Sequence, residues 1–127
     1  MIQVTNVHKA FGKNQVLKGV SLTVEQGDVI VILGPSGSGK TTLLRTINFL
    51  DKADEGELTI GGKTVHLKNA TKKEILEVRR KTAFVFQNHN LFNNKTALEN
   101  VTEGLIVARK VPKAEAERRG KEALDKV

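Results

Sequence analysis

The chain contains no cysteine, no tryptophan and no tyrosine, and only two of its 127 residues are proline. The absence of cysteine excludes disulfide frameworks, thiolate metal sites and cysteine nucleophiles. The longest apolar runs, Val29–Leu33 and Thr82–Phe86, are far shorter than the roughly 20 residues that cross a bilayer. Met1–Val4 enters a strand-like pattern directly, without the basic and then apolar segments of a signal peptide. The absence of cysteine also fits a cytoplasmic protein.

The remaining composition is that of a packed chain of about one domain's length. Hydrophobic residues make up 39% and charged residues 28%, which is not the composition of a disordered chain. The net charge of +7 and the pI near 9.8 raise the question of nucleic acid binding. Of five phenylalanines, however, only Phe84 and Phe86 alternate, inside an apolar run more typical of a buried strand than of a base-stacking platform. We therefore expect a solvated basic surface and no specific nucleic-acid partner.

The first part of the chain shows strand patterns followed by one helix pattern. Ile2–Val24 is largely period-two, with turn residues at Gly12–Asn14, and this predicts two antiparallel strands with one wet face. Val29–Leu33 is a continuous, mostly β-branched run, typical of a parallel-sheet strand that is buried on both faces. Apolar residues at helical spacing then predict a helix over Lys40–Leu50.

The second part of the chain adds a hairpin, another apolar run and three helices. Glu57–Leu67 alternates around a Gly61–Gly62 turn and predicts a β-hairpin. Thr82–Phe86 is a second candidate for a buried strand. Two capping boxes, each a Thr three residues before a Glu, mark helix starts. The predicted helices run from Thr71 to Arg80, from Thr96 to near Arg109, and from about Pro112 with Ala116, Gly120, Ala123, Leu124 and Val127 on one face.

The segment Gly34–Thr41 has the spacing of a phosphate-binding loop: Gly, four residues, Gly, Lys and Thr. It follows a predicted strand and opens a predicted helix, as the mechanism of such a loop requires. The alternative is a Gly/Ser-rich loop before an ordinary helix, and motif and context together favour the phosphate loop. Its glycines permit unusual dihedrals and close approach of phosphate oxygens; they are Gly34, Gly37 and Gly39. The amides that converge on the phosphates at the positive helix end are those of Ser36, Gly37, Ser38, Gly39, Lys40, Thr41 and Thr42.

Side chains of the same segment supply the charge and the metal ligand. Lys40 offers a full positive charge to the β- and γ-phosphates, and the Thr41 hydroxyl is placed to ligate Mg²⁺. Thr42 is expected near the α-phosphate. Gln87 follows the run Thr82–Phe86, where its amide oxygen has two possible roles: it reaches Mg²⁺ or the attacking water, or it bonds to backbone at a strand end.

The order of these motifs resembles the nucleotide-binding subunit of an ATP-binding cassette (ABC) transporter over essentially the whole chain. In that family an aromatic residue before the second strand stacks on adenine, and Phe11 occupies the matching place, with Val16 opening the second strand. Gly34–Thr42 resembles the Walker A loop, and Phe84–Gln87 resembles the Q-loop, whose Gln reaches Mg²⁺ and links the site to the membrane subunits. The resemblance implies ATP and Mg²⁺ as cofactors, with Lys40 and Gln87 in catalytic roles and Thr41 and Gln87 at the metal.

The resemblance also implies a fold and partners. It implies an α/β P-loop NTPase of the ABC type, with an incomplete core sheet, an antiparallel β-subdomain and the start of a helical subdomain. Residues 1–95 match the N-terminal part of the nucleotide-binding domain, and 96–127 match the start of the helical subdomain. Asn90–Phe92 and Thr96–Val101 are most similar to ATPases of polar amino-acid importers. The implied partners are a second ATP-binding subunit and transmembrane permease subunits, at the inner face of the cell membrane.

Several parts of the family pattern have no counterpart before Val127: the signature loop, the Walker B strand with its Asp and catalytic Glu, and the switch His. After Lys40 no apolar run ends in Asp. We therefore expect this chain alone to hydrolyse ATP negligibly, and Val29–Leu33 to expose unpaired strand edges. Two alternatives stay open: a non-transport ABC-type ATPase acting on nucleic acid or ribosomes, suggested by the charge of +7, and a nucleotide-binding fragment without turnover.

Overall fold

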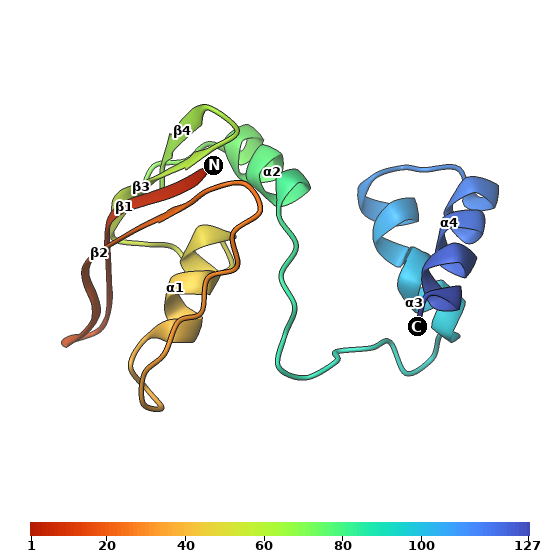
Figure 1. Cartoon of the computed structure of the whole chain (residues 1–127), viewed down its shortest axis with the longest axis horizontal. Helices are drawn as coiled ribbons and strands as arrows, with labels where there is room; N and C mark the ends of the chain where they lie inside the picture. Colours follow the sequence, from red (N-terminus) through yellow and green to blue (C-terminus); the bar gives the residue numbers. More distant parts are fainter. The chain divides into compact units, whose positions relative to one another are not determined.

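The computed structural model describes all of residues 1–127 and divides them into two compact units, Met1–Phe84 and Val85–Val127 (Figure 1). Each unit is described by itself. None of the helices in either unit is long and apolar enough to cross a membrane.

The first unit is built on one antiparallel sheet of four strands, in the order β2-β1-β3-β4. Its strands are β1 (Ile2–Phe11), β2 (Asn14–Val24), β3 (Glu55–Ile60) and β4 (Lys63–His66). β1 pairs with both β2 and β3, and β4 pairs with β3. Both predicted hairpins are therefore confirmed, because the turns at Gly12 and at Gly61–Gly62 lie where the period-two patterns break.

Two helices accompany this sheet, α1 (Lys40–Ile47) and α2 (Lys72–Lys81). α2 begins at the predicted capping box, in which the Thr71 hydroxyl accepts from the Glu74 N–H and the Glu74 carboxylate accepts from the Thr71 N–H. This exchange satisfies two donors that the first helical turn leaves without partners. α1 begins differently, because Gly39 precedes it without any side-chain cap.

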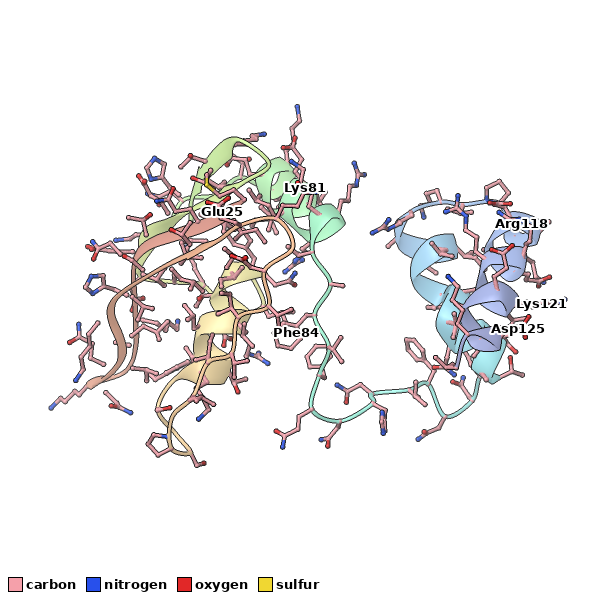
Figure 2. The ribbon with its side chains drawn as sticks, viewed as in Figure 1. Glu25, Lys81, Phe84, Arg118, Lys121 and Asp125 are labelled. Atoms are coloured by element: carbon pink, nitrogen blue, oxygen red, sulfur yellow. The ribbon has the colours of Figure 1, made fainter.

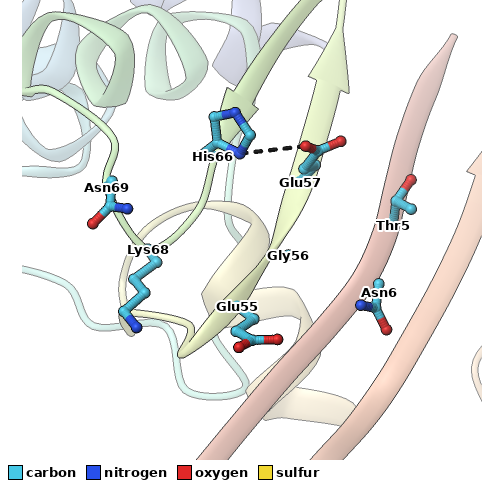
Figure 3. A pocket seen from close by; sticks show the side chains of 8 residues that line it. All are labelled: Thr5, Asn6, Glu55, Gly56, Glu57, His66, Lys68 and Asn69. Atoms are coloured by element: carbon cyan, nitrogen blue, oxygen red, sulfur yellow. Dashed lines mark ion pairs between the residues drawn. The ribbon is translucent and has the colours of Figure 1, made fainter.

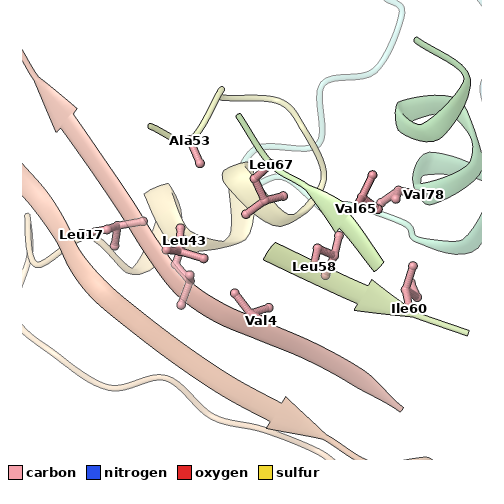
Figure 4. Close-up of a cluster of buried hydrophobic side chains, with 10 residues drawn as sticks. Val4, Leu17, Leu43, Ala53, Leu58, Ile60, Val65, Leu67 and Val78 are labelled. Carbon is pink, nitrogen blue, oxygen red and sulfur yellow. The ribbon is translucent and has the colours of Figure 1, made fainter. Parts of the chain in front are cut away.

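The core of the first unit lies between one face of the sheet and the two helices (Figure 4). Burial of these apolar side chains is the main favourable term in folding this unit. The cluster consists of Val4, Val7, Leu17, Leu43, Ala53, Leu58, Ile60, Val65, Leu67 and Val78. Leu43 from α1 and Val78 from α2 thereby fix both helices to the sheet.

Two predicted strands do not form. Val29–Leu33 and Thr82–Phe86 lie outside every ladder of the sheet, and Val29 is 88% exposed, so the prediction of strands buried on both faces is wrong here. A parallel strand is held by hydrogen bonds to its neighbours and covered by helices, and no strand of this chain pairs with either segment. Within Val29–Leu33 only Ile32 packs against the core. The backbone of this segment is unpaired, as expected, although the segment is not a strand.

The second unit is a helical hairpin. α3 (Ala97–Glu103) continues into a π-helical turn, η1 (Gly104–Ala108), and α4 (Lys113–Asp125) follows after Pro112. The capping box of Thr96 and Glu99 is formed, and α4 begins directly after Pro112, so the predicted starts of both helices are confirmed. Charged side chains such as Arg118, Lys121 and Asp125 project from α4 (Figure 2).

Close packing joins the helices of this second unit. A Cβ added to Gly120 would lie only 2.7 Å from Thr102 Cγ2 and 2.9 Å from Leu98 Cδ1. Ala116 and Gly120 of the predicted apolar face are buried, whereas Val127 is fully exposed. The absence of a side chain at Gly120 therefore lets α4 approach α3.

Candidate functional site

The loop Gly34–Gly39 is anchored through the helix that follows it. Leu43 is 5% exposed and lies in the core of the first unit, and Thr46, one turn further on, is completely buried. The Thr46 hydroxyl donates to the Leu43 carbonyl oxygen at 2.7 Å, so this buried polar group is satisfied. The start of α1 is thus held in a defined place, with Gly39 buried and Gly34–Ser38 before it exposed.

The backbone of the loop uses the left-handed region twice. Gly37 has φ +80° and Gly39 has φ +96°, dihedrals at which an L side chain costs about 1–3 kcal/mol. Between these glycines the Ser38 N–H donates to the Pro35 carbonyl oxygen at 3.2 Å, and the first helical bond runs from the Leu43 N–H to the Gly39 carbonyl oxygen. The glycines therefore let the chain turn directly into α1.

The amino end of α1 carries positive partial charge that no acidic group offsets. The first N–H groups of a helix have no intrahelical acceptor, and α1 has neither a side-chain cap nor an acidic residue in its first turn. α2 and α3, by contrast, each begin with a capping box that places a Glu there. The exposed N-terminus of α1, which includes Thr41 and Thr42, is therefore suited to an anion.

The Lys40 ammonium lies over the loop itself. Its Nζ donates to the carbonyl oxygens of Gly34 and Pro35, both at 2.7 Å, and to the Ser38 hydroxyl at 3.3 Å. All three acceptors are neutral, so no carboxylate compensates the charge. The loop and the start of α1 thus combine a cation with helix amides that have no intrahelical acceptor, an arrangement that favours a group with several negative oxygens.

A bulge in β2 lies against the loop at Gly39. The register of the β1–β2 pair shifts between Lys9 and Ala10, which pair with Leu17 and Gln15 and leave Val16 as the extra residue. A bulge of this kind redirects side chains. A Cβ on Gly39 would lie 2.8 Å from Val16 Cγ1 and 3.3 Å from Leu17 Cδ2. Val16 therefore lies against the candidate loop at Gly39, and its predicted place in a nucleotide site stays a prediction.

Phe11 lies at the end of the same hairpin. It pairs with Asn14, which precedes Val16 by two residues, or about 7 Å along a strand. The Phe11 side chain is 50% exposed, and the Lys9 ammonium lies over its ring, 4.9 Å from the centroid. The β1–β2 hairpin thus brings Phe11, Val16 and the loop to one region of the first unit.

Gln87 belongs to the other unit. It is exposed, in the segment that precedes α3. The structure does not place this unit relative to the first, so the predicted roles of Gln87 at Mg²⁺ and in catalysis stay predictions. No group of three or more His, Asp and Glu side chains in the chain is arranged to hold a metal ion by itself.

Two arginines hold the chain that leaves the carboxyl end of α1. Arg45 Nε donates to Asp51 Oδ2 at 2.8 Å, and this hydrogen bond lowers the pKa of the Asp51 carboxyl below its usual value. Arg79 of α2 donates to the carbonyl oxygens of Asn48 and Phe49, at 3.3 and 2.8 Å. A cation at a helix C-terminus is favourable, so these contacts fix α1 from the end opposite the loop.

Sequence reasoning missed Lys9 and both arginines. Period-two spacing in a strand places Lys9 and Phe11 on one face of β1, so the sequence pattern alone could have indicated that they are neighbours. The partners of Arg79 lie about thirty residues away along the chain, and no local pattern indicates them.

A separate hollow of about 390 Å³ is lined by residues of β1, of the β3–β4 hairpin and of the segment after β4 (Figure 3). Thr5, Asn6 and Lys68 are among its lining residues, and His66 Nδ1 lies 3.3 Å from Glu57 Oε1 at its rim. None of its lining residues belongs to the candidate loop. It is therefore not part of the site described above.

Comparison with known proteins decides the family. A family model described as ABC transporter matches residues 17–127. This chain belongs to the ABC transporter family. The family assignment confirms the resemblance of the motif order, because the matched range contains the loop, the β3–β4 hairpin and the segment around Gln87.

Curated relatives of this ABC chain include amino-acid import proteins. The L-cystine import ATP-binding protein TcyN of Bacillus subtilis is 51% identical over 116 residues, which are 91% of this chain and 45% of that protein. The probable amino-acid import ATP-binding protein YxeO of the same organism is 51% identical over all of this chain and 51% of its own length. The chain therefore spans about half the length of the curated relatives it matches.

Solved structures confirm the expected fold class, an α/β ABC-type ATPase with an antiparallel β-subdomain. The dimeric structure of MJ0796, a bacterial ABC transporter cassette, matches with a TM-score of 0.83 and 38% identity, over 98% of this ABC chain and 56% of that chain. A dimeric post-hydrolysis state of MJ0796, bound to ADP and Pi, matches with a TM-score of 0.81, 37% identity and the same coverage. The fold observed here corresponds to about half of that cassette.

Proposed function

We propose that the exposed loop and the first turn of α1 bind the phosphates of Mg·ATP. The observation that carries the proposal is the Lys40 ammonium, held by two carbonyl oxygens at 2.7 Å beside an uncapped helix N-terminus. A polyphosphate offers this ammonium charged acceptors in place of neutral ones, and charge-assisted hydrogen bonds are about twice as strong as neutral ones. The bound ADP and Pi of the related MJ0796 structure support the ligand class.

Individual residues of the chain receive roles in this proposal. Lys40 reaches the β- and γ-phosphates, the Thr41 hydroxyl ligates Mg²⁺, and Thr42 lies at the α-phosphate. Backbone amides from Ser36 through Thr42 surround the phosphates, and the glycines among them leave room for phosphate oxygens to approach because they have no Cβ. Phe11 and Val16 contact the adenine, and Gln87 completes the Mg²⁺ site. Mg²⁺ supplies neutralisation of the phosphate charge when it is bound.

For the complete protein we propose ATP hydrolysis that energises transmembrane transport, with amino acids as the transported class. The proposal is supported by relatives whose names describe amino-acid and L-cystine import. The dimeric state of the MJ0796 cassette supports a second ATP-binding subunit as partner. Permease subunits of the cell membrane are the further partners, and the protein acts at the inner face of that membrane.

Residues 1–127 are proposed to bind Mg·ATP without appreciable turnover. After Lys40 no apolar run ends in Asp, and phosphoryl transfer in this class of site also needs an acidic residue at the metal and a group that activates the water. Magnesium-dependent phosphate release by the purified chain, abolished in Lys40→Ala, contradicts this part of the proposal.

Calorimetric titration with Mg·ATP tests the binding site. Lys40→Ala is expected to weaken binding roughly 10- to 100-fold, the loss of hydrogen bonds to charged oxygens. Lys13→Ala is the matched control, because it removes a lysine of the β1–β2 turn and is expected to retain binding. Equal affinities of the native chain and Lys40→Ala contradict the proposed site.

A further inference from the structure

We propose that Lys9 is a positioning residue for the adenine base, acting through the Phe11 ring. The inference rests on the proposed nucleotide site and assigns a part of it that the loop motif does not contain. Its basis is a chain of contacts that runs from the loop Lys52–Asp54 through Lys9 to the face of Phe11.

Lys9 is held between a backbone oxygen and the ring. Its Nζ donates to the Lys52 carbonyl oxygen at 2.7 Å and lies 4.9 Å from the centroid of the Phe11 ring. A cation within about 6 Å of a ring centroid is attracted to the π-face. Lys9 therefore covers one face of Phe11 and restricts the orientation of the ring.

The loop that holds Lys9 is itself fixed to β1. The Asp54 N–H donates to the His8 carbonyl oxygen at 2.8 Å, and Asp54 Oδ2 accepts from the Ala10 N–H at 2.7 Å. Between them Ala53 is 2% exposed and belongs to the core. Two hydrogen bonds and one buried side chain therefore set the distance between the Lys52 carbonyl oxygen and the end of β1.

The exposure of Phe11 fits a ring with one covered and one open face. The side chain is 50% exposed although its neighbour on the strand occupies part of its surface. A flat base needs an open, correctly oriented π-face, and stacking of a base on an aromatic side chain is sequence-tolerant but geometry-dependent. A ring oriented before binding loses less conformational freedom when the base arrives. Lys9 is therefore expected to assist binding of the base through the Phe11 ring, without itself contacting the phosphates.

The position of the ring relative to the loop agrees with one ligand spanning both. Phe11 pairs with Asn14, and the bulged Val16 contacts the loop at Gly39. The ring and the loop are therefore connected through three residues of β2. Because this connection is short, the distance between the Phe11 ring and the phosphate loop can vary little.

A pair of ligands separates the role of Lys9 from the role of the loop. Mg·ATP and Mg·tripolyphosphate share the phosphates, and only ATP has a base. In Lys9→Met the ring is no longer held before binding, so the affinity for ATP is expected to fall by up to about fivefold, the limit set by an exposed cation–π contact. The affinity for tripolyphosphate is expected to stay unchanged. Lys9→Arg keeps a cation over the ring and is expected to restore ATP affinity. Lys13→Met controls for the loss of one positive charge in the same hairpin.

Equal weakening of ATP and tripolyphosphate in Lys9→Met, beyond that of Lys13→Met, overturns the proposal, because Lys9 then acts as a charge toward the phosphates. Failure of Lys9→Arg to restore ATP affinity overturns it as well. Thermal unfolding of each variant identifies any loss of fold.

Adenosine has no phosphates, so it tests binding of the base to the Phe11 ring without any contribution from the phosphate loop. Adenosine is expected to shift the NMR signals of the Phe11 ring in the native chain and less in Lys9→Met at the same concentration. If the native chain binds no tripolyphosphate and adenosine still shifts Phe11, the proposed phosphate site fails and the role of Lys9 stands. If adenosine shifts the ring equally in both chains, or in neither, the role of Lys9 is wrong.

Discussion

Val16 occupies the space that a side chain at Gly39 would need, since a Cβ on Gly39 would lie 2.8 Å from Val16 Cγ1. The contact joins the bulge of β2 to the residue that precedes α1. Gly39 is thus required twice, once for its φ of +96° and once for its neighbour. Gly37 shares only the first requirement, because its φ is +80° and no atom lies within 4 Å of a Cβ built there.

Gly39→Ala is therefore expected to destabilise the chain more than Gly37→Ala. A left-handed dihedral at a residue with a side chain costs about 1–3 kcal/mol, and this cost applies to both variants. The clash with Val16 adds to it only at Gly39 and forces a shift of the loop or of β2. Urea unfolding of the two variants and the native chain measures the difference. Equal losses in the two variants show that β2 does not support the loop.

The exposed segment Val29–Leu33 predicts self-association. Val31 is 71% exposed and Leu33 is 86% exposed, and the backbone of this segment pairs with no strand. Exposed apolar edges are templates for pairing with another chain. We expect Val31→Lys to lower the average mass of the chain in sedimentation at high concentration. Val107→Lys, on the helical unit and 55% exposed in the native chain, is the matched control and is expected to leave it unchanged.

Local signals predicted most of the elements. The β1–β2 and β3–β4 hairpins follow from period-two patterns broken at glycine turns, and the capping boxes at Thr71 and Thr96 locate two helix starts. These predictions are correct because the chemistry of turns and helix caps involves only a few neighbouring residues. The exposure of Val29–Leu33 could not be predicted in this way, because the burial of such a run depends on neighbouring strands that its own sequence does not describe.

In the candidate site, too, local patterns predict some residues and contacts between distant parts of the chain decide others. Spacing alone identifies the loop residues, since Lys40 and its glycines lie within one short motif. The contacts that orient Phe11 join residues far apart in the chain: the Lys9 ammonium meets the carbonyl oxygen of Lys52. Such contacts depend on how β1 and the loop before β3 come together, which no short-range pattern encodes.

Two glycines of the second unit are expected to respond oppositely to alanine. A Cβ at Gly120 would lie 2.7 Å from Thr102 Cγ2, whereas nothing lies within 4 Å of a Cβ at Gly104. Gly120→Ala is expected to destabilise the helical hairpin by about 1–3 kcal/mol through overpacking. Gly104→Ala is expected to stabilise it by roughly 0.5–1 kcal/mol, because alanine loses less backbone entropy in a helix. Thermal unfolding followed by circular dichroism measures both, and a stabilising Gly120→Ala contradicts the close packing of α3 and α4.

Acid is expected to weaken α4 through Glu115. Its carboxylate accepts hydrogen bonds from Arg118 Nη2 at 2.7 Å and Arg119 Nε at 2.8 Å, and these lower the pKa of Glu115 from its usual 4.5 to about 2. The unfolded chain therefore binds more protons than the folded chain between these two pH values. The stabilisation is complete above pH 4.5 and is lost as the pH falls toward 2.

Glu115→Gln tests this pH dependence, because glutamine keeps the size of the side chain and removes the titrating group. The variant is expected to unfold at a lower temperature than the native chain at pH 7. It is expected to lose less stability between pH 5 and about pH 2, because it lacks the carboxyl group that takes up a proton on unfolding in this range. Glu117→Gln is the control, because Glu117 lies 3.9 Å from Lys113 and contacts neither arginine. If native and Glu115→Gln chains lose equal stability over this range, the two arginines do not hold Glu115 in its charged form.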